Sequence, residues 1–243
     1  MGDRTPQREV DRAVPATAMA SVVALLALAN VMSNRVLPAE AYVPWNLGVA
    51  ALLLVIARRH VTDGELGLGE WRCGAAFGGV LAALTLGVML LALAMPVFHQ
   101  LYEDRRVDDT AAEVMYQALV RVPLGTVLLE ELAFRSVVPA MAARRLGVLR
   151  ASVVASALFG LWHVLPAWNL NRSNEAAGDV FGSGTWGTVA AVGFGVVGTT
   201  IAGLWWCWIR VRARSILATV IAHTATNSIG YLLAFAVMRS RAA

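Results

Sequence analysis

Apolar residues form seven long runs along the chain, separated by short polar stretches rich in arginine. The runs cover about 16–32, 43–57, 74–98, 114–143, 151–168, 186–209 and 215–238. A helix that crosses a bilayer needs about 20 mostly apolar residues, within a range of about 17–25. The pattern therefore predicts an all-α, polytopic bundle of transmembrane helices with about seven spans, or eight if the fourth run divides.

The fourth run, 114–143, is longer than one span requires and contains Pro123 and Pro139. Proline removes a backbone hydrogen-bond donor and clashes with the preceding helical turn. We therefore expect a kinked helix here, or a helix with an extension along the membrane interface.

Composition agrees with a protein that is solvated by lipid. The chain has 243 residues, of which 58% are hydrophobic and 15% charged, with a mean hydropathy of +0.63. A soluble domain carries about 25% charged residues. The basic residues form short clusters between apolar runs, without the basic stripe interleaved with aromatics that nucleic-acid binding requires, so no nucleic-acid partner is expected. Cys73 and Cys207 form no CxxC motif, and we expect no disulfide.

The arginines also predict an orientation. With seven spans and a cytoplasmic N-terminus, twelve arginines fall on the cytoplasmic side and six on the other, while the acidic stretch 103–109 lies outside. An excess of Arg in cytoplasmic loops is the usual bias of membrane proteins. Residues 1–15 are then a cytoplasmic N-terminal tail. Trp205, Trp206 and Trp208, next to Arg210, indicate an aromatic belt at the interface.

Six of the polar residues inside the apolar runs are candidates for a functional site. They are Glu130, Glu131, Arg135, His163, His223 and Asn227. A charged side chain at the bilayer centre costs about 2.5–3.5 kcal/mol on insertion scales, so these groups must face polar partners or a wet cavity.

Two spacings among these residues are those of one helix face. Glu131 and Arg135 are four positions apart, as are His223 and Asn227, so each pair can interact along its own helix. Taken singly, such a pair is as well explained by helix packing as by chemistry, and a lone histidine such as His163 is more often structural.

Their depth in the membrane indicates convergence. Glu130 is 14 residues before Arg144, His163 is 13 after Arg150, and Asn227 is 13 after Arg214. At 1.5 Å per residue each lies about 20 Å along its helix from an arginine-marked end. Three helices running in alternate directions would therefore place their polar groups in one layer, as a catalytic site requires.

The three motifs, Glu130-Glu131-Leu-Ala-Phe-Arg135, Phe159-Gly-Leu-Trp-His163 and His223-Thr-Ala-Thr-Asn227, occur in this order on three separate runs. This pattern, EExxxR, FxxxH and HxxxN, resembles that of the CPBP intramembrane proteases, also called the Abi or CAAX-protease family. The family includes the Ras-converting CAAX endopeptidase and bacterial proteins linked to bacteriocin processing or immunity. The resemblance covers about residues 115–235, and the N-terminal part matches only in being hydrophobic. The apolar runs predict N-terminal transmembrane helices over 16–113, and the resemblance implies a catalytic helical core over 114–238 in an integral protein of the bacterial plasma membrane.

The resemblance also implies roles. Glu130 and His163 would activate a water for attack on a peptide carbonyl, Glu131 and Arg135 would support the site, and His223 and Asn227 would donate hydrogen bonds to the oxyanion. The substrate would be a membrane-associated peptide or protein, and whether it carries a lipid stays open. No cofactor is required by this mechanism.

Two alternatives remain open at this point. Glu130, His163 and His223 could hold a catalytic zinc, which takes three protein ligands and one open position, although the HExxH motif is absent. The chain could also be a non-catalytic membrane protein, such as an immunity protein, a scaffold or a transporter with a buried Glu/His relay. The sequence shows no internal repeat of the transporter kind.

Overall fold

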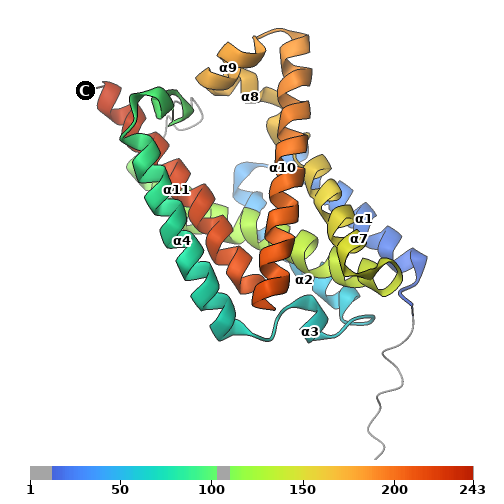
Figure 1. The fold of residues 1–243 in the computed structure, drawn as a ribbon. Coiled ribbons are helices and arrows are strands. Elements are labelled where there is room, and N and C mark those ends of the chain that lie inside the picture. The colour runs from blue at the N-terminus through green and yellow to red at the C-terminus, as the bar shows by residue number, and fades with distance from the viewer. Residues whose placement is uncertain (1–12, 103–109, 243) are drawn as a thin grey trace, which may run out of the picture.

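The computed structural model describes residues 13–102 and 110–242. Most of the tail predicted at 1–15 and the acidic stretch 103–109 lie outside these residues. The described residues fold into helices without any β-strand (Figure 1). The prediction of an all-α bundle is therefore confirmed.

Six helical stretches among the described residues are long and apolar enough to cross a membrane. They are Ala16–Val36, Ala39–Ala57, Asp63–Leu93, Ala111–Trp162, Thr185–Ala213 and Ile216–Ser240. The fourth stretch is 52 residues long, and its helix is interrupted at Gly147, where φ is 75° and ψ is 163°. A non-glycine residue rarely adopts a positive φ. The two arms on either side of Gly147 correspond to the runs predicted at 114–143 and 151–168, so the expected count of about seven is roughly matched.

Among the described residues, the N-terminal part contains four α-helices. They are α1 (Ala16–Val31), α2 (Tyr42–Ala57), the short α3 (Asp63–Leu66) and α4 (Trp71–Leu93). The second part contains α5 (Ala111–Tyr116), η5 (Gln117–Val127), α6 (Leu128–Glu131), η6 (Leu132–Val137), α7 (Val138–Trp162), α8 (Leu170–Ser173), α9 (Glu175–Phe181), α10 (Thr185–Ala213) and α11 (Ile216–Ala242).

The kink expected in the fourth run takes the form of two wide helical segments. The backbone is π-helical over η5, which contains Pro123, and again over η6, so that α6 is a single α-helical turn between them. π-Helical turns accompany functional sites in many proteins because they change the direction of the side chains that follow. Pro139 lies just after η6, in the first turn of α7, and the sharp change of direction comes later, at Gly147.

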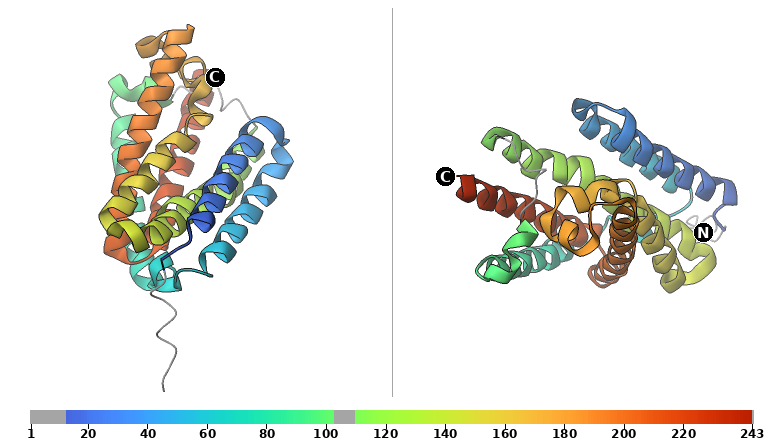
Figure 2. Two further views of the ribbon diagram at one scale, coloured as in Figure 1. Left: turned by 90° about the vertical axis from the view of Figure 1, so that its right-hand side faces the viewer. Right: turned by 90° about the horizontal axis from the view of Figure 1, so that it is seen from above.

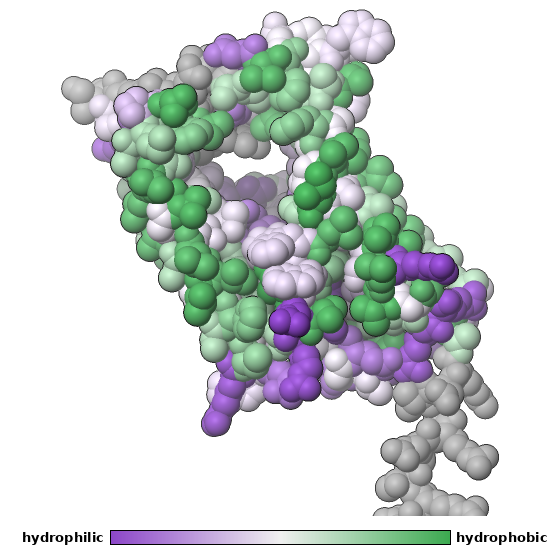
Figure 3. All heavy atoms as spheres, in the orientation of Figure 1, coloured by the Kyte–Doolittle hydropathy of each residue, from purple (hydrophilic) through white to green (hydrophobic). Residues whose placement is uncertain are grey.

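Two pairs of helices frame the bundle (Figures 1 and 2). Helix α4 packs along α11, where a Cβ on Gly78 would lie 2.8 Å from Cβ of Ile221. Helix α10 packs along α7, where a Cβ on Gly203 would lie 3.0 Å from Cβ of Ser156. The pairs diverge toward the end that carries α8 and α9, and Figure 3 shows an opening in the surface between α4 and α10.

The helix α3 closes the opposite end of the bundle. Ser136 donates a hydrogen bond of 2.7 Å to the carbonyl of Leu66, and the Ile216 amide donates one of 2.9 Å to Gly67. Four arginines that the sequence grouped on one side, Arg58, Arg144, Arg210 and Arg214, all contact residues of the segment 63–70. Their common end is therefore confirmed, and hydrophilic residues gather there in Figure 3. Which membrane face this end occupies stays a prediction.

Candidate active site

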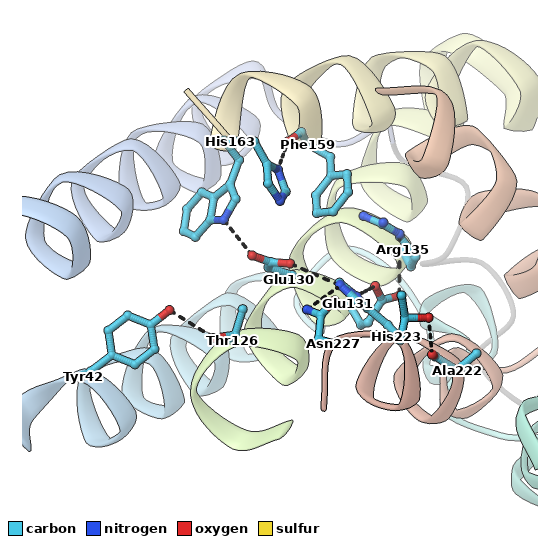
Figure 4. A network of polar contacts seen from close by, with 12 residues as sticks. Tyr42, Thr126, Glu130, Glu131, Arg135, Phe159, His163, Ala222, His223 and Asn227 are labelled. Carbon is cyan, nitrogen blue, oxygen red and sulfur yellow. Dashed lines mark hydrogen bonds and ion pairs between the residues drawn. The ribbon is translucent and has the colours of Figure 1, made fainter. Parts of the chain in front are cut away.

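Three helical segments that are distant in sequence bring the predicted site residues to one place (Figure 4). Glu130 and Glu131 come from α6, His163 directly follows α7, and His223 belongs to α11. Glu131 is completely buried, Glu130 is 5% exposed and His223 is 7% exposed. Such burial of carboxylates is tolerated only where partners compensate the loss of solvation.

Glu131 forms the most enclosed contacts of the cluster. Its Oε1 lies 2.8 Å from Nδ1 of His223, and its Oε2 lies 3.5 Å from Nε of Arg135, which is also fully buried. A carboxylate only accepts hydrogen bonds, so the imidazole Nδ1 carries the proton of the first contact. The pairing of Glu131 with Arg135 that the spacing predicted is therefore present, and the same carboxylate also orients His223.

Glu130 is fixed by contacts to two other helices. Trp162 donates from Nε1 to Oε1 of Glu130 at 2.9 Å, across α7. The other carboxylate oxygen, Oε2, lies 3.8 Å from Nε2 of His223 on α11. The two oxygens thus face different helices, and the carboxylate lies between the end of α7 and the middle of α11 (Figure 4).

His163 lies at the C-terminal end of α7. Its Nδ1 makes a 2.8 Å hydrogen bond with the carbonyl of Phe159, and its ring packs edge-on against Phe159 at 4.5 Å between centroids. Because a carbonyl cannot donate, Nδ1 carries the proton, which leaves Nε2 as an acceptor in the neutral ring. Figure 4 shows His163 on the same side of the cluster as the Glu130 carboxylate.

Asn227 lies one turn after His223 on α11. Its Nδ2 is 3.2 Å from Nε2 of His223, so the two side chains share a face as the spacing predicted. Asn227 and Glu130 therefore lie on either side of the same imidazole nitrogen.

Aromatic residues that the sequence did not assign to the site complete it. Trp206, which we expected only in the interfacial belt, also stacks on the His223 ring, with 5.9 Å between the ring centroids and an interplanar angle of 18°. Its neighbours Trp205 and Trp208 are about half exposed and stack on each other, as belt residues would. Trp162 was also missed. A buried indole N–H usually finds an acceptor, and its place directly before His163 was the one available indication.

Glu130, His163 and His223 are also the residues that a catalytic zinc would use. Within the described ranges, no group of three or more His, Cys, Asp or Glu side chains is placed to hold a metal ion. His163 and His223 each use Nδ1 for a protein hydrogen bond, as metal-binding histidines also do, and Nε2 of His223 lies 3.8 Å from Oε2 of Glu130. These contacts are compatible with either mechanism, and removal of metal by chelation distinguishes the two.

Comparison with known proteins gives one match. Residues 113–229, about half of the chain, match the family described as Type II CAAX prenyl endopeptidase Rce1-like. The matched segment contains all six polar residues of the cluster. No curated protein and no solved structure matches the chain.

Proposed function

Residues 113–229 belong to the CAAX protease family, whose activity is intramembrane endopeptidase cleavage, and from this premise we propose that Glu130 and His163 activate the attacking water. The observation that carries this proposal is the position of Glu130. It is an almost buried carboxylate with one oxygen held by Trp162 and the other directed toward His223. A general base must be fixed within hydrogen-bond reach of the proton that it removes.

The proposed reaction begins with a water that donates hydrogen bonds to the Glu130 carboxylate and to Nε2 of His163. Glu130 takes a proton from this water as its oxygen forms a bond to the carbonyl carbon of the substrate peptide. The carbonyl π electrons move onto the oxygen, which becomes the oxyanion. Glu130 then returns the proton to the amide nitrogen as the C–N bond breaks, so that a carboxylic acid and an amine are released. The resting orientation of His163, with Nδ1 on the Phe159 carbonyl, supports this role because it leaves Nε2 free to accept.

We assign the oxyanion to the side of the site formed by His223 and Asn227. The Asn227 amide has two N–H donors and uses only one toward His223. A protonated His223 would have Glu131 as its counter-ion at 2.8 Å and would donate from Nε2. One donor of this kind is worth about 2.7–4 kcal/mol of transition-state stabilisation. Arg135 supports this arrangement by pairing with Glu131 and by lying 3.9 Å over the Phe159 ring.

We further propose the cellular setting and the first substrate to assay. The six apolar helical stretches and the family make this an integral membrane protein that acts on a peptide substrate. The arginine distribution supports a cytoplasmic N-terminus, and the bacterial members of the family support a bacterial plasma membrane. Because the family description names prenyl endopeptidases, a C-terminal peptide with a prenylated CAAX sequence is the substrate to try first.

The test is peptide cleavage by the purified protein in proteoliposomes, with products identified by mass spectrometry in ¹⁸O-labelled water. The proposal predicts a single internal cut and one ¹⁸O atom in the new carboxyl group. A farnesylated peptide, the same peptide without the farnesyl group, and an unrelated transmembrane peptide form the substrate panel. If none of the three is cut by the folded protein, the chain is not a peptidase of this kind.

A further inference from the structure

A cavity lies beside the site, at the arginine-rich end of the bundle. It has a volume of about 220 Å³ and lies between the two arms of α7, on either side of Gly147, and the C-terminal end of α10. The charged side chains that line it are Arg135, Arg210 and Glu65. Of the residues that line the cavity, only Arg135 has a role in the proposed reaction.

The Arg135 guanidinium is short of acceptors. It is fully buried, and among the described residues neither Nη1 nor Nη2 has a hydrogen-bond partner, while Nε lies at 3.5 Å from Glu131. Nε of Arg210 likewise has no hydrogen-bond partner in the described part of the chain, and its Nη2 donates to the backbone carbonyl of Glu65. A buried charged donor that stays unpaired costs more than about 1–3 kcal/mol, so a polar group must occupy the space next to these atoms.

The charges around the cavity favour an anion. The two carboxylates nearby are already engaged, since Glu65 pairs with Arg144 at 2.7 Å and Glu131 with His223 at 2.8 Å. Arg144 pairs with the Glu65 carboxylate and Arg135 with that of Glu131, whereas Arg210 contacts the backbone carbonyl of Glu65 and has no carboxylate partner in the described part of the chain, so its positive charge is in excess. Guanidinium groups match the planar or tetrahedral oxygens of carboxylates and phosphates.

The mouth of the cavity is apolar and faces outward. Val148 and Val211 line it and are also 59% and 42% exposed, on the outer surface of α7 and α10. A volume of about 220 Å³ is below the roughly 300–1,000 Å³ of sites that enclose a whole drug-sized ligand. It suits a small headgroup whose acyl chains remain outside, along the apolar surface.

We propose that this cavity binds the phosphate headgroup of an anionic membrane lipid through Arg135 and Arg210. Basic pockets between helices on the cytoplasmic side are places where phospholipid headgroups bind. Arg135 also supports the peptidase site, but lipid binding is measured without cleavage, and Arg210 takes no part in the proposed reaction.

The experiment measures lipid retention by native mass spectrometry, with the full chain released from nanodiscs of phosphatidylglycerol or of phosphatidylcholine. Wild type is expected to keep one phosphatidylglycerol and no phosphatidylcholine. Arg210→Gln removes a ligand and Ala143→Phe fills the cavity, so each is expected to lower the affinity for phosphatidylglycerol at least tenfold. The matched control is Arg214→Gln. This arginine has a 76% exposed side chain, pairs with Glu70 at the same end and does not line the cavity.

Three results would overturn the proposal. One is equal retention of the two lipids by wild type. Another is equal retention of phosphatidylglycerol by Arg210→Gln and Arg214→Gln, with the folding of both variants checked by tryptophan fluorescence. This comparison holds even if Ala143→Phe fails to fold. The third is an equal increase in the protein's thermal stability from inorganic phosphate alone and from phosphatidylglycerol. The ligand would then be free phosphate, and the lipid would be unnecessary.

Discussion

Replacing Glu131 by glutamine tests whether the buried ion pair supports the site. Glu131 and Arg135 are both completely buried, with 3.5 Å between the closest charged atoms. At an effective dielectric constant of about 20, two unit charges at this distance attract by about 5 kcal/mol. Removing one partner leaves Arg135 as an uncompensated buried charge, for which about 3–5 kcal/mol of destabilisation is typical. We therefore expect Glu131→Gln to lower the free energy of unfolding by about 3–5 kcal/mol.

The assay is reversible unfolding in mixed micelles, followed by tryptophan fluorescence. The control is Asp63→Asn, which breaks the pair between Asp63 and Arg58 at 2.8 Å. That pair is more than half exposed, so its loss should cost at most about 1 kcal/mol. The double variant Glu131→Gln/Arg135→Met should recover part of the lost stability because it removes the orphaned charge. If Glu131→Gln costs no more than Asp63→Asn, the supporting role assigned to this pair is wrong.

Three further predictions concern the site and the bundle. Trp162→Phe removes the indole N–H that donates to Glu130 at 2.9 Å but keeps an aromatic ring. A hydrogen bond to a charged group is worth about 1.5–3 kcal/mol, so this variant should lower kcat roughly 10- to 150-fold with little change in KM. An unchanged kcat would show that this contact does not orient the base. Cleavage should persist after exhaustive chelation and dialysis, and activity that is lost and then restored by added zinc would contradict the glutamate mechanism. Gly78→Leu should lower the free energy of unfolding by about 1–3 kcal/mol in the same micelle assay, because its side chain would collide with α11. A Cβ on Gly79 meets nothing within 4 Å, so Gly79→Leu should keep a stability close to that of wild type. Equal effects of the two substitutions would refute the packing argument.

The sequence predicted the helical architecture and the members of the polar cluster because both follow from the cost of placing groups in lipid. Seven apolar runs leave little choice but helices, and polar groups such as Glu130 and His223 must find one another when each is expensive alone. The pairing of Glu131 with Arg135 follows from helix periodicity by itself.

The contacts that the sequence did not predict join distant segments through groups that are not costly in lipid. Trp162 and Trp206 are ordinary membrane residues, and their contacts with Glu130 and His223 depend on the rotation of α7 and α10 about their axes. Likewise, the pairing of Glu65 with Arg144 depends on how α3 folds back under the bundle, outside the residues that match the family. No local pattern fixes such rotations.

The central claim is that Glu130 is the base that activates water, and the most direct measurement is the single-turnover rate constant of peptide cleavage by Glu130→Gln. The matched control is Glu113→Gln, on the same segment, where the side chain is exposed, caps the start of α5, and can keep this role as an amide. Since a positioned general base contributes about 10²–10⁴-fold, the account predicts a fall of at least about 10²-fold for Glu130→Gln and no more than about twofold for Glu113→Gln. A folded Glu130→Gln protein that cleaves at the rate of the Glu113→Gln control would contradict it.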